Sequence, residues 1–248
     1  MRKILPIILI CCFLSLGSGS RDMVNTASSG ADYITWGDAF YSDDFTYCLW
    51  FYPETVDTGA RTIVAKRNDD ADPPAASANI ELHLYFTATG IFFNSWKSGN
   101  VVLAAASAAS TVTANIWNFS CMVSEGNGGT NYVYFENVKN SGNTNDAALQ
   151  NTTSSLQIGA RTNNNNTRWL DGQTAYFLAS SNALSYYELN QLSYFPTLLY
   201  NGAQIISPIL GNSPENDLSG NGKTGALHSS PPTSNNGPPI MFGGGLYL

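Results

Sequence analysis

Charged side chains are scarce in this chain of 248 residues. They make up 12% of the sequence, about half the share found in typical soluble proteins. The formal net charge is −7 at pH 7, which argues against nucleic acid as a partner because phosphate binding requires a basic surface. The hydrophobic share of 43% is large enough for a sizeable core. The polar surface must then come from Asn, Ser, Thr and Gly, as is typical of turn-rich extracellular proteins.

Histidine is rare as well, and His83 and His228 are the only two in the chain. Nucleophilic catalysis by His83 would need a Ser or Cys partner, and no motif of that kind accompanies it. We therefore expect His83 to be an ordinary strand histidine that faces outward.

Long apolar runs are missing, with one exception at the N-terminus. Arg2 and Lys3 are followed by ILPIILICCFLSLG and then by SGS, the order of basic, apolar and small residues in a secretory signal peptide. The run is too short to span a bilayer comfortably. We expect residues 1–20 to be removed and the mature chain to be secreted without a membrane span. The plausible cleavage positions follow Gly17, Ser18 or Ser20.

A lipid anchor on Cys11 or Cys12 is the alternative to secretion. It ranks second because Ile10 precedes the first of these cysteines, where a lipoprotein peptidase usually takes a small residue. Removal of the signal peptide leaves only Cys48 and Cys121. An even number of cysteines in an oxidising compartment favours a disulfide, and two buried free thiols are the alternative.

Short apolar stretches separated by Gly, Asn, Asp and Pro follow one another from residue 31 onward. This pattern predicts an all-β fold, an antiparallel sandwich. The stretches span residues 32–36, 45–53, 61–66, 79–86, 90–96, 101–106, 116–124, 131–138, 154–160 and 173–180.

The stretch FTYCLWFYP differs from the others because both of its faces are apolar. One face carries Phe45, Tyr47, Leu49 and Phe51, and the other carries Cys48, Trp50 and Tyr52. A strand with one buried face alternates apolar with polar residues. The pattern therefore predicts a central strand covered on both sides. NIELHLYF alternates instead, which predicts that Glu81, His83 and Tyr85 face outward.

One short helix is predicted near residues 185–195. In LSYYELNQLSYFP, Ser185 is an N-cap with Glu188 three residues later, which forms a capping box. Leu184 precedes the cap and can pack against Leu189, and Pro196 ends the helix.

Beyond about residue 200 the composition changes to Gly, Pro, Ser and Asn. Such a segment is either a disordered tail or an addition of one or two strands to the sandwich. We divide the chain into a signal peptide (1–20), a sandwich (21–200) and a C-terminal tail (201–248). We expect residues 31–196 to fold without the tail, which a chain ending near Leu199 tests.

The order of these elements resembles a known family. FTYCLWFYPE, then WNFSCMVSEGNGGTNYVYFENV, LQIG and DGQTAYFLASSNALSYYEL are similar to a laminin G-like module of the concanavalin A-like lectin/glucanase superfamily. The pentraxins are a branch that it resembles, and the resemblance covers about residues 31–196. It implies a concanavalin A-like jelly roll. It also implies pairing of Cys48 with Cys121, which occupy the places of the pentraxin disulfide.

The chain departs from the family where metal and catalysis are concerned. The loop that carries calcium ligands in pentraxins reads ARTNNNNTR here, with no carboxylate before Asp171. Glucanases of the superfamily place Glu-x-Asp-x-x-Glu on one strand, and this spacing does not occur. Because hydrolysis of a glycosidic bond needs two carboxylates, we expect no enzyme activity.

A second loop offers oxygen ligands for Ca²⁺. RNDDAD precedes a strand that begins with an asparagine, and pentraxins take an Asp–Asn pair from the corresponding hairpin. The predicted calcium ligands are Asp69, Asp70, Asp72 and Asn79. The alternative is an ordinary solvated acidic loop.

RTNNNNTRWLD combines amides with a tryptophan, which is suitable chemistry for a sugar. The predicted ligand-binding residues are Asn163, Asn164, Asn165, Arg168, Trp169 and Asp171. The alternative is a turn with Trp169 in the core. Together these features predict a secreted, non-catalytic module that binds glycans or another extracellular ligand. A structural or adhesive decoration protein of a cell or virion surface is the alternative.

Overall fold

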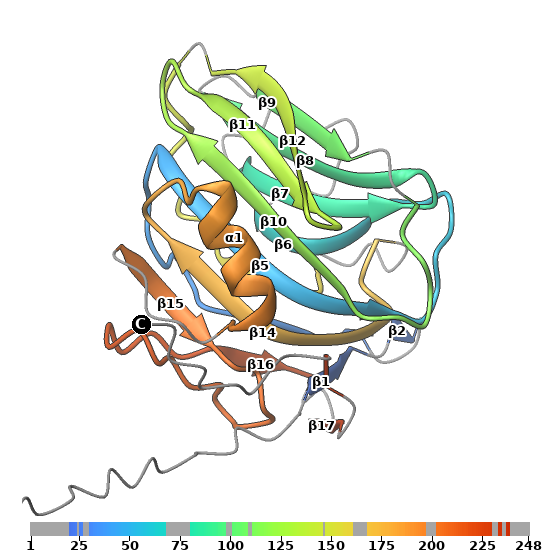
Figure 1. The fold of residues 1–248 in the computed structure, drawn as a ribbon. Helices are drawn as coiled ribbons and strands as arrows, with labels where there is room; N and C mark the ends of the chain where they lie inside the picture. The colour runs from blue at the N-terminus through green and yellow to red at the C-terminus, as the bar shows by residue number, and fades with distance from the viewer. Residues whose placement is uncertain are drawn as a thin grey trace, which may run out of the picture.

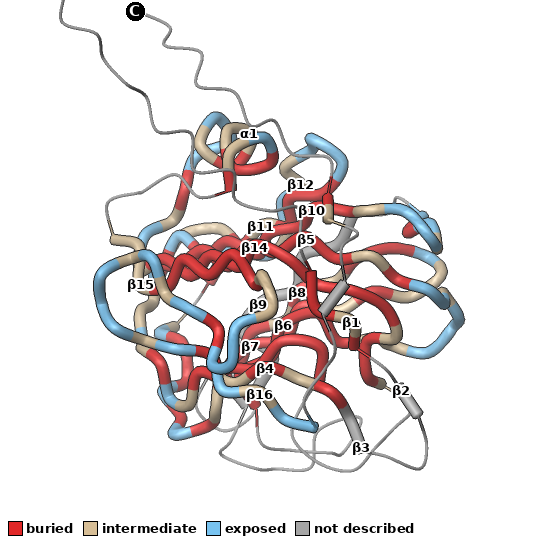
Figure 2. Tube along the Cα trace, turned by 90° about the horizontal axis from the view of Figure 1, so that it is seen from below, coloured by how far each residue is buried: buried red, intermediate tan, exposed pale blue. Residues whose placement is uncertain are grey.

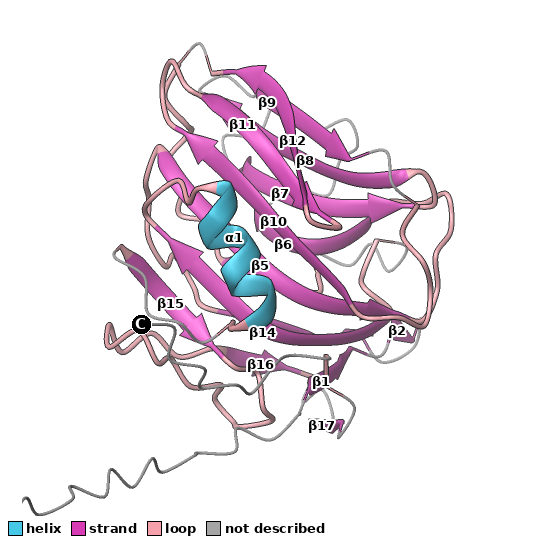
Figure 3. Ribbon diagram, viewed as in Figure 1, coloured by secondary structure: helices cyan, strands magenta, loops and turns pink. Residues whose placement is uncertain are grey.

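The computed structural model describes the chain from residue 20 to residue 238, with gaps. The described residues are 20–23, 25–26, 30–67, 80–97, 101–108, 111–145, 147–160, 168–196, 202–229, 233–234 and 237–238. They form two antiparallel sheets packed face to face, and a helix lies on the outer face of one sheet (Figure 1 and Figure 3). The predicted all-β, concanavalin A-like sandwich is confirmed.

The first sheet has the strand order β12-β11-β10-β5-β14-β1-β17, and β15 pairs with β14. Its strands are β1 (Ser20–Met23), β5 (Asp44–Pro53), β10 (Asn118–Glu125), β11 (Thr130–Phe135), β12 (Val138–Thr144), β14 (Gly172–Ser180), β15 (Ala203–Ser207) and β17 (Thr233–Ser234).

The second sheet has the order β16-β4-β13-β6-β7-β8-β9. Its strands are β4 (Tyr33–Thr35), β6 (Arg61–Arg67), β7 (Ile80–Thr87), β8 (Gly90–Lys97), β9 (Val101–Ala108), β13 (Leu156–Ile158) and β16 (Ala226–His228). A separate pair joins β2 (Asn25–Thr26) and β3 (Gly30–Ala31).

β5 is a central strand covered on both sides, as its sequence predicts. Its inward residues join the core between the sheets, where strands of the second sheet contribute Leu84, Phe86 and Phe93. Its outward residues Cys48 and Trp50 belong to a second buried cluster, which leucines of the helix complete. Figure 2 shows the resulting buried layers, with exposed residues mainly in the loops and on the helix.

The predicted disulfide is present. Cys48 of β5 lies directly opposite Cys121 of β10, and their sulfur atoms are 2.07 Å apart. The bridge joins two neighbouring strands on the outer face of the first sheet, beneath the helix.

The helix α1 (Tyr186–Tyr194) is also where the sequence predicts it. Ser185 is the N-cap, and its side chain and that of Glu188 form the reciprocal capping box. Leu184 is buried in the same cluster as Leu189 and Leu192, so the helix is anchored to the first sheet by one apolar stripe. Among the described residues, no helix has the length and hydrophobicity needed to cross a membrane.

The predicted strand over residues 131–138 is confirmed up to Phe135, but its last three residues form a turn and the start of another strand. β11 ends at Phe135, and the chain reverses at Glu136 and Asn137, whose φ angles are 49° and 60°. Two successive residues with positive φ form the tight hairpin turn that suits the twist of antiparallel strands. β12 then continues with polar, mostly exposed residues, which carry no alternation that would reveal a strand.

Glu81 and His83 of β7 are buried, although the alternation in the sequence predicts that they face outward. His83 Nε2 lies 3.0 Å from the Thr62 hydroxyl, and its ring stacks on Tyr85. The Glu81 carboxylate lies 2.8 Å from Lys66 Nζ. Both side chains are therefore satisfied structural groups of the second sheet.

The segment after residue 200 adds strands to both sheets. β15 pairs with β14, and β16 pairs with β4. Ile205, Ile206 and Ile209 are fully buried, and each contributes about 1.5–3 kcal/mol of burial free energy. The structure thus supports the extra-strand interpretation of the tail. That residues 31–196 fold alone stays a prediction. A chain without the tail would lose the burial free energy of these isoleucines.

Candidate functional site

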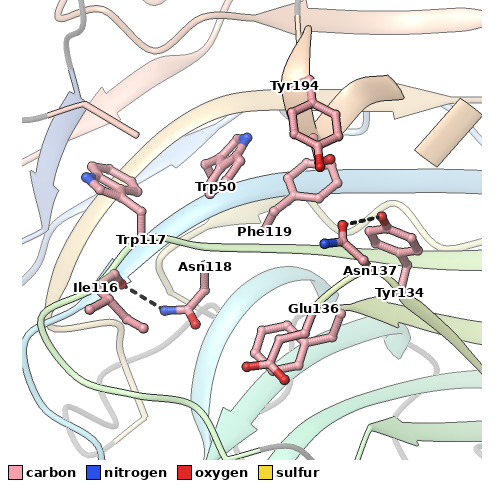
Figure 4. A pocket seen from close by; sticks show the side chains of 11 residues that line it. Trp50, Ile116, Trp117, Asn118, Phe119, Tyr134, Glu136, Asn137 and Tyr194 are labelled. Carbon is pink, nitrogen blue, oxygen red and sulfur yellow. Dashed lines mark hydrogen bonds between the residues drawn. The ribbon is translucent and has the colours of Figure 1, made fainter. Parts of the chain in front are cut away.

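A hollow of about 320 Å³ opens on the outer face of the first sheet, beside the C-terminal end of α1 (Figure 4). Its walls come from β5, the segment leading into β10, β10 itself, the end of β11, the β11–β12 turn and the end of the helix. The lining residues are Trp50, Ile116, Trp117, Asn118, Phe119, Tyr134, Phe135, Glu136, Asn137, Ser193 and Tyr194.

The hollow exists because the helix is too short to cover the sheet. A helix of nine residues is about 13 Å long, and α1 covers the disulfide and the neighbouring strand residues with Leu189 and Leu192. Beyond Tyr194 the helix has ended, and Trp50 and Phe119 lie at the margin of its cover. An apolar sheet face is thus left partly open at one end.

Aromatic rings form the floor and walls of the hollow. The ring of Phe119 lies between Trp50 and Tyr134, with centroid distances of 5.3 Å and 5.9 Å. Trp117 rests on Tyr52 with its centroid 5.6 Å away. Such contacts fix the orientation of rings. The hollow therefore presents a largely preformed aromatic surface.

Neutral polar groups stand at the edge of this surface. The Asn118 amide donates to the carbonyl of Ile116 at 2.8 Å, which leaves its own Oδ1 as an acceptor. The Tyr134 hydroxyl donates to Asn137 Oδ1 at 3.0 Å, which leaves the Asn137 amide as a donor. Burial raises the pKa of Tyr134 to about 12, so this hydroxyl stays protonated at physiological pH. Figure 4 shows both asparagines below Trp50, Phe119 and Tyr194.

The indole N–H groups of Trp50 and Trp117 have no hydrogen-bond partner, and neither do those of Trp36, Trp96 and Trp169 elsewhere in the described residues. These unpaired indoles are therefore not particular to the hollow, and the two asparagines are its distinguishing polar groups. Aromatic faces with a few neutral donors and acceptors suit an uncharged, hydroxylated ring.

The binding loop predicted from the sequence lies elsewhere in the molecule. Asn163, Asn164 and Asn165 are outside the described residues. Trp169 is 6% exposed and packs with Ala160 and Tyr33, which is the core position that the alternative interpretation gives it. None of the residues that line the hollow belongs to this loop. The ligand-binding role of the loop, including Arg168, stays a prediction.

Asp171 of that loop has two acidic neighbours, Asp22 and Glu54. Burial and then the charge of Asp171 raise the pKa of Asp22, and burial followed by the charges of Asp22 and Asp171 raises the pKa of Glu54. Thr55 donates a hydrogen bond to the Asp171 carboxylate. Within the described residues, no group of three or more ligating side chains has an arrangement that could hold a metal ion. The predicted calcium ligands Asp69, Asp70, Asp72 and Asn79 lie outside those residues.

Sequence reasoning did not find the hollow, although parts of the pattern are visible in the sequence. Trp50 stands on the second apolar face of β5, and Trp117 and Phe119 lie close together before Cys121. The β11–β12 turn was missed because its residues, Glu136 and Asn137, are not the usual Asn-Gly or Asp-Gly pair. That turn supplies the polar edge of the hollow.

Solved structures of other proteins share this fold. A candidate carbohydrate-binding protein of Bacteroides ovatus aligns with a TM-score of 0.65 and 13% identity, over 92% of this chain and 62% of that one. This chain therefore spans less than two thirds of the Bacteroides protein.

Two further structures align over about 70% of this chain. A heptameric SAP-like pentraxin of Limulus polyphemus has a TM-score of 0.53 and 11% identity, over 71% of this chain and 81% of that one. The CBM40 of a Ruminococcus gnavus IT-sialidase, bound to α2,3-sialyllactose, has a TM-score of 0.53 and 12% identity. The alignment covers 70% of this chain and 97% of the CBM40. At such identities these likenesses show the fold alone.

A search among curated proteins found no match. The laminin G-like family described as the concanavalin A-like lectin/glucanases superfamily matches residues 28–190. This match covers more than half of the chain, and the protein therefore belongs to the concanavalin A-like lectin/glucanases superfamily.

Proposed function

We propose that the protein is a secreted, non-catalytic module that binds glycans in the hollow beside α1. The observation that carries this proposal is the hollow itself, in which aromatic faces meet two neutral amides. Pockets of about 300 Å³ and more, mostly apolar with a few placed polar groups, are typical of small-ligand sites. A pyranose ring has the matching surface, with apolar C–H faces and hydroxyls around its edge.

The descriptions of similar structures support the same ligand class. The Bacteroides protein is a candidate carbohydrate binder, and the Ruminococcus module was solved with an oligosaccharide. The shared fold is compatible with sugar binding at more than one surface, because function on a common fold resides in the site. The assignment to this hollow therefore rests on its own residues.

A binding role suits the hollow better than hydrolysis does. Glycosidases place two carboxyl groups on either side of the scissile bond. Glu136 is the only carboxylate among the described residues that line the hollow. We expect the protein to release no reducing sugar from the glycans that it binds.

Secretion is supported by the N-terminal sequence and by the disulfide, which forms in oxidising compartments. Ser20 bears on where a signal peptide would be cleaved. It is buried in β1, and its hydroxyl donates to Gln173 of β14 at 2.9 Å. Cleavage after Gly17 or Ser18 would keep β1 whole, whereas cleavage after Ser20 would remove its first residue.

Calcium stays a separate proposal, with Asp69, Asp70, Asp72 and Asn79 as its ligands. Binding assays run in calcium and in a chelator address it. A sugar affinity that the chelator leaves unchanged would show that calcium takes no part in binding that sugar.

The proposal is tested by removing one tyrosine ring at a time from α1. Tyr194 lines the hollow, and Tyr187 on the same helix is 70% exposed and does not line it. On a glycan array, Tyr194→Ala should weaken binding of the best ligand at least fivefold, about 1 kcal/mol, because an aromatic face is lost. Tyr187→Ala is the matched control and should leave the affinity unchanged.

Equal affinities for the two variants would move the ligand away from the hollow. If the wild-type protein bound no glycan at all, the proposal itself would fail. Melting curves of both variants, which should coincide, separate a binding effect from a folding effect.

The adhesive alternative, a surface or virion decoration protein, has one observation in its favour. Tyr186, Tyr187 and Tyr194 are exposed on α1 by 47%, 70% and 39%, and tyrosine is enriched at protein interfaces. A protein contact through this helix would be weakened by Tyr187→Ala as much as by Tyr194→Ala. For a sugar in the hollow, only Tyr194→Ala should weaken binding.

A further inference from the structure

The charges on the side chains that line the hollow bear on whether it can take neutral or acidic glycans. Glu136 is the only charged side chain among the lining residues that the structure describes, and no Lys, Arg or His is among them. Glu136 is exposed at the β11–β12 turn. An anionic sugar in the hollow would meet a carboxylate and no cation.

Lys139, a basic residue of the neighbouring strand β12, is already engaged. Lys139 of β12 lies opposite Tyr134 in the strand register. Its Nζ is 3.7 Å from the centroid of the Tyr132 ring and 3.6 Å from Glu125 Oε1. Neither contact involves a residue that lines the hollow. Recruiting Lys139 to an anionic ligand would therefore cost these two contacts.

The hydrogen-bonding groups of the hollow are neutral and of both kinds. Asn118 offers its Oδ1 as an acceptor and Asn137 offers its amide nitrogen as a donor, and the atom of each that bonds within the protein makes only one such bond. A hydroxyl group both donates and accepts, whereas a carboxylate or sulfate only accepts. The pair of asparagines therefore matches vicinal hydroxyls better than an acidic substituent.

We propose that the hollow selects uncharged glycans and rejects their sialylated, uronic or sulfated counterparts. This inference rests on the proposed function and names the class of sugar that the site takes. Rejection arises from a like charge and an unpaired anion rather than from shape, which is a common route to specificity. The expected class of ligand differs from the sialylated sugar that the CBM40 structure holds.

The test is an array of matched pairs, in which each neutral oligosaccharide stands beside its sialylated or sulfated counterpart. The wild-type protein should bind the neutral member of a recognised pair at least tenfold more tightly in 0.15 M salt. The ratio of the affinity for the neutral member to the affinity for the acidic member should fall at 1 M salt, where the screening length drops from about 8 Å to about 3 Å. Glu136→Gln should narrow the ratio as well, and Glu136→Lys should narrow it further.

Asp44→Asn is the control for these variants. It makes the same charge change as Glu136→Gln at an exposed residue where β5 begins, outside the hollow, and it should leave the ratio unchanged.

Equal or tighter binding of the acidic members would overturn the inference and leave glycan binding intact. A ratio that Asp44→Asn narrows as much as Glu136→Gln would also overturn it, because net charge and not the hollow would then set the preference. Binding to no member of any pair would overturn the proposed function and this inference together.

Discussion

The two faces of strand β5 both carry large apolar residues, yet these residues lie in different surroundings. The inward face, with Phe45, Tyr47, Leu49 and Phe51, is at most 2% exposed along its whole length. It meets another sheet, which has seven strands against the eight of its own. The outward face meets a single nine-residue helix, which buries Cys48 at 1% exposure and leaves Trp50 at 9%.

The difference shows that the partner layer decides what an apolar face does. A sheet packed on a sheet excludes water over the whole contact, so the inward side chains serve stability. A short helix covers only part of a sheet, so the remaining aromatic residues can contact a ligand. We therefore expect mutations on the inward face to change the free energy of unfolding and mutations at the hollow to change affinity.

The largest effect is expected on the inward face. Phe51→Ala removes a fully buried ring that stacks on Phe86 of the second sheet. Truncation of a core phenylalanine costs about 3–5 kcal/mol, a large part of a typical domain's stability. Urea titration should show a lower midpoint with an unchanged slope, while the folded fraction keeps its affinity for sugar.

Tyr194→Ala is the counterpart of this variant at the hollow, and its unfolding midpoint should stay close to that of the wild type. If Phe51→Ala unfolded at the wild-type midpoint, or if Tyr194→Ala lowered the midpoint as strongly, the division between the two faces would be wrong.

The next largest effect is expected from the disulfide on the outward face. Replacing Cys48 and Cys121 by alanine opens a loop with a sequence separation of 73, and loss of such a bridge costs about 2–4 kcal/mol. Denaturant titration of the double variant measures this loss. Denatured, unreduced wild-type protein should show no free thiol.

A count of two free thiols in the mature protein would contradict the disulfide. The single variant Cys48→Ala provides a further check. It should be as unstable as the double variant, because either substitution removes the same bridge.

The fold was predictable because its elements depend on local patterns. The two apolar faces of β5 mark a central strand, and the reciprocal Ser185 and Glu188 contacts mark the helix start. Both patterns involve residues a few positions apart, where backbone geometry fixes which side chains share a face. The pairing of Cys48 with Cys121 came from their number, the expected compartment and the resemblance to pentraxins.

The site was not predictable because it is formed by residues that are far apart in the sequence, and local sequence patterns do not show which of them meet in the fold. Trp50, Phe119, Glu136 and Tyr194 come from four separate segments, and the hollow arises where α1 ends over the sheet. The burial of His83 likewise depends on Thr62 of the neighbouring strand and not on the alternation within β7. The structure of the tail could not be predicted from its sequence because its isoleucines are placed by pairing with β14, a strand far away in the sequence.

The smallest effect is expected where β5 ends, at the acidic neighbours of Asp171. The pKa of Asp22 is raised, mainly by burial and then by the charge of Asp171. The folded chain thus binds this proton more readily than the unfolded chain does, so its contribution to stability is present below the ordinary pKa of 3.8 and is lost as pH rises through the raised value. Asp22→Asn should therefore raise the melting midpoint at pH 7.

The size of this shift follows from the exposure of the group. Asp22 is only partly buried, and solvent screens such charges. We therefore expect the melting midpoint of Asp22→Asn to rise by about 1–2 °C at low salt. For a chain of this size, 1 kcal/mol of stability corresponds to roughly 2–4 °C. The difference between variant and wild type should shrink at pH 3 and in 1 M salt. Asp44→Asn makes the same charge change away from this group and should give no comparable rise. A lower midpoint for Asp22→Asn at pH 7 would mean that its carboxylate stabilises the strand end, contrary to the repulsion inferred here.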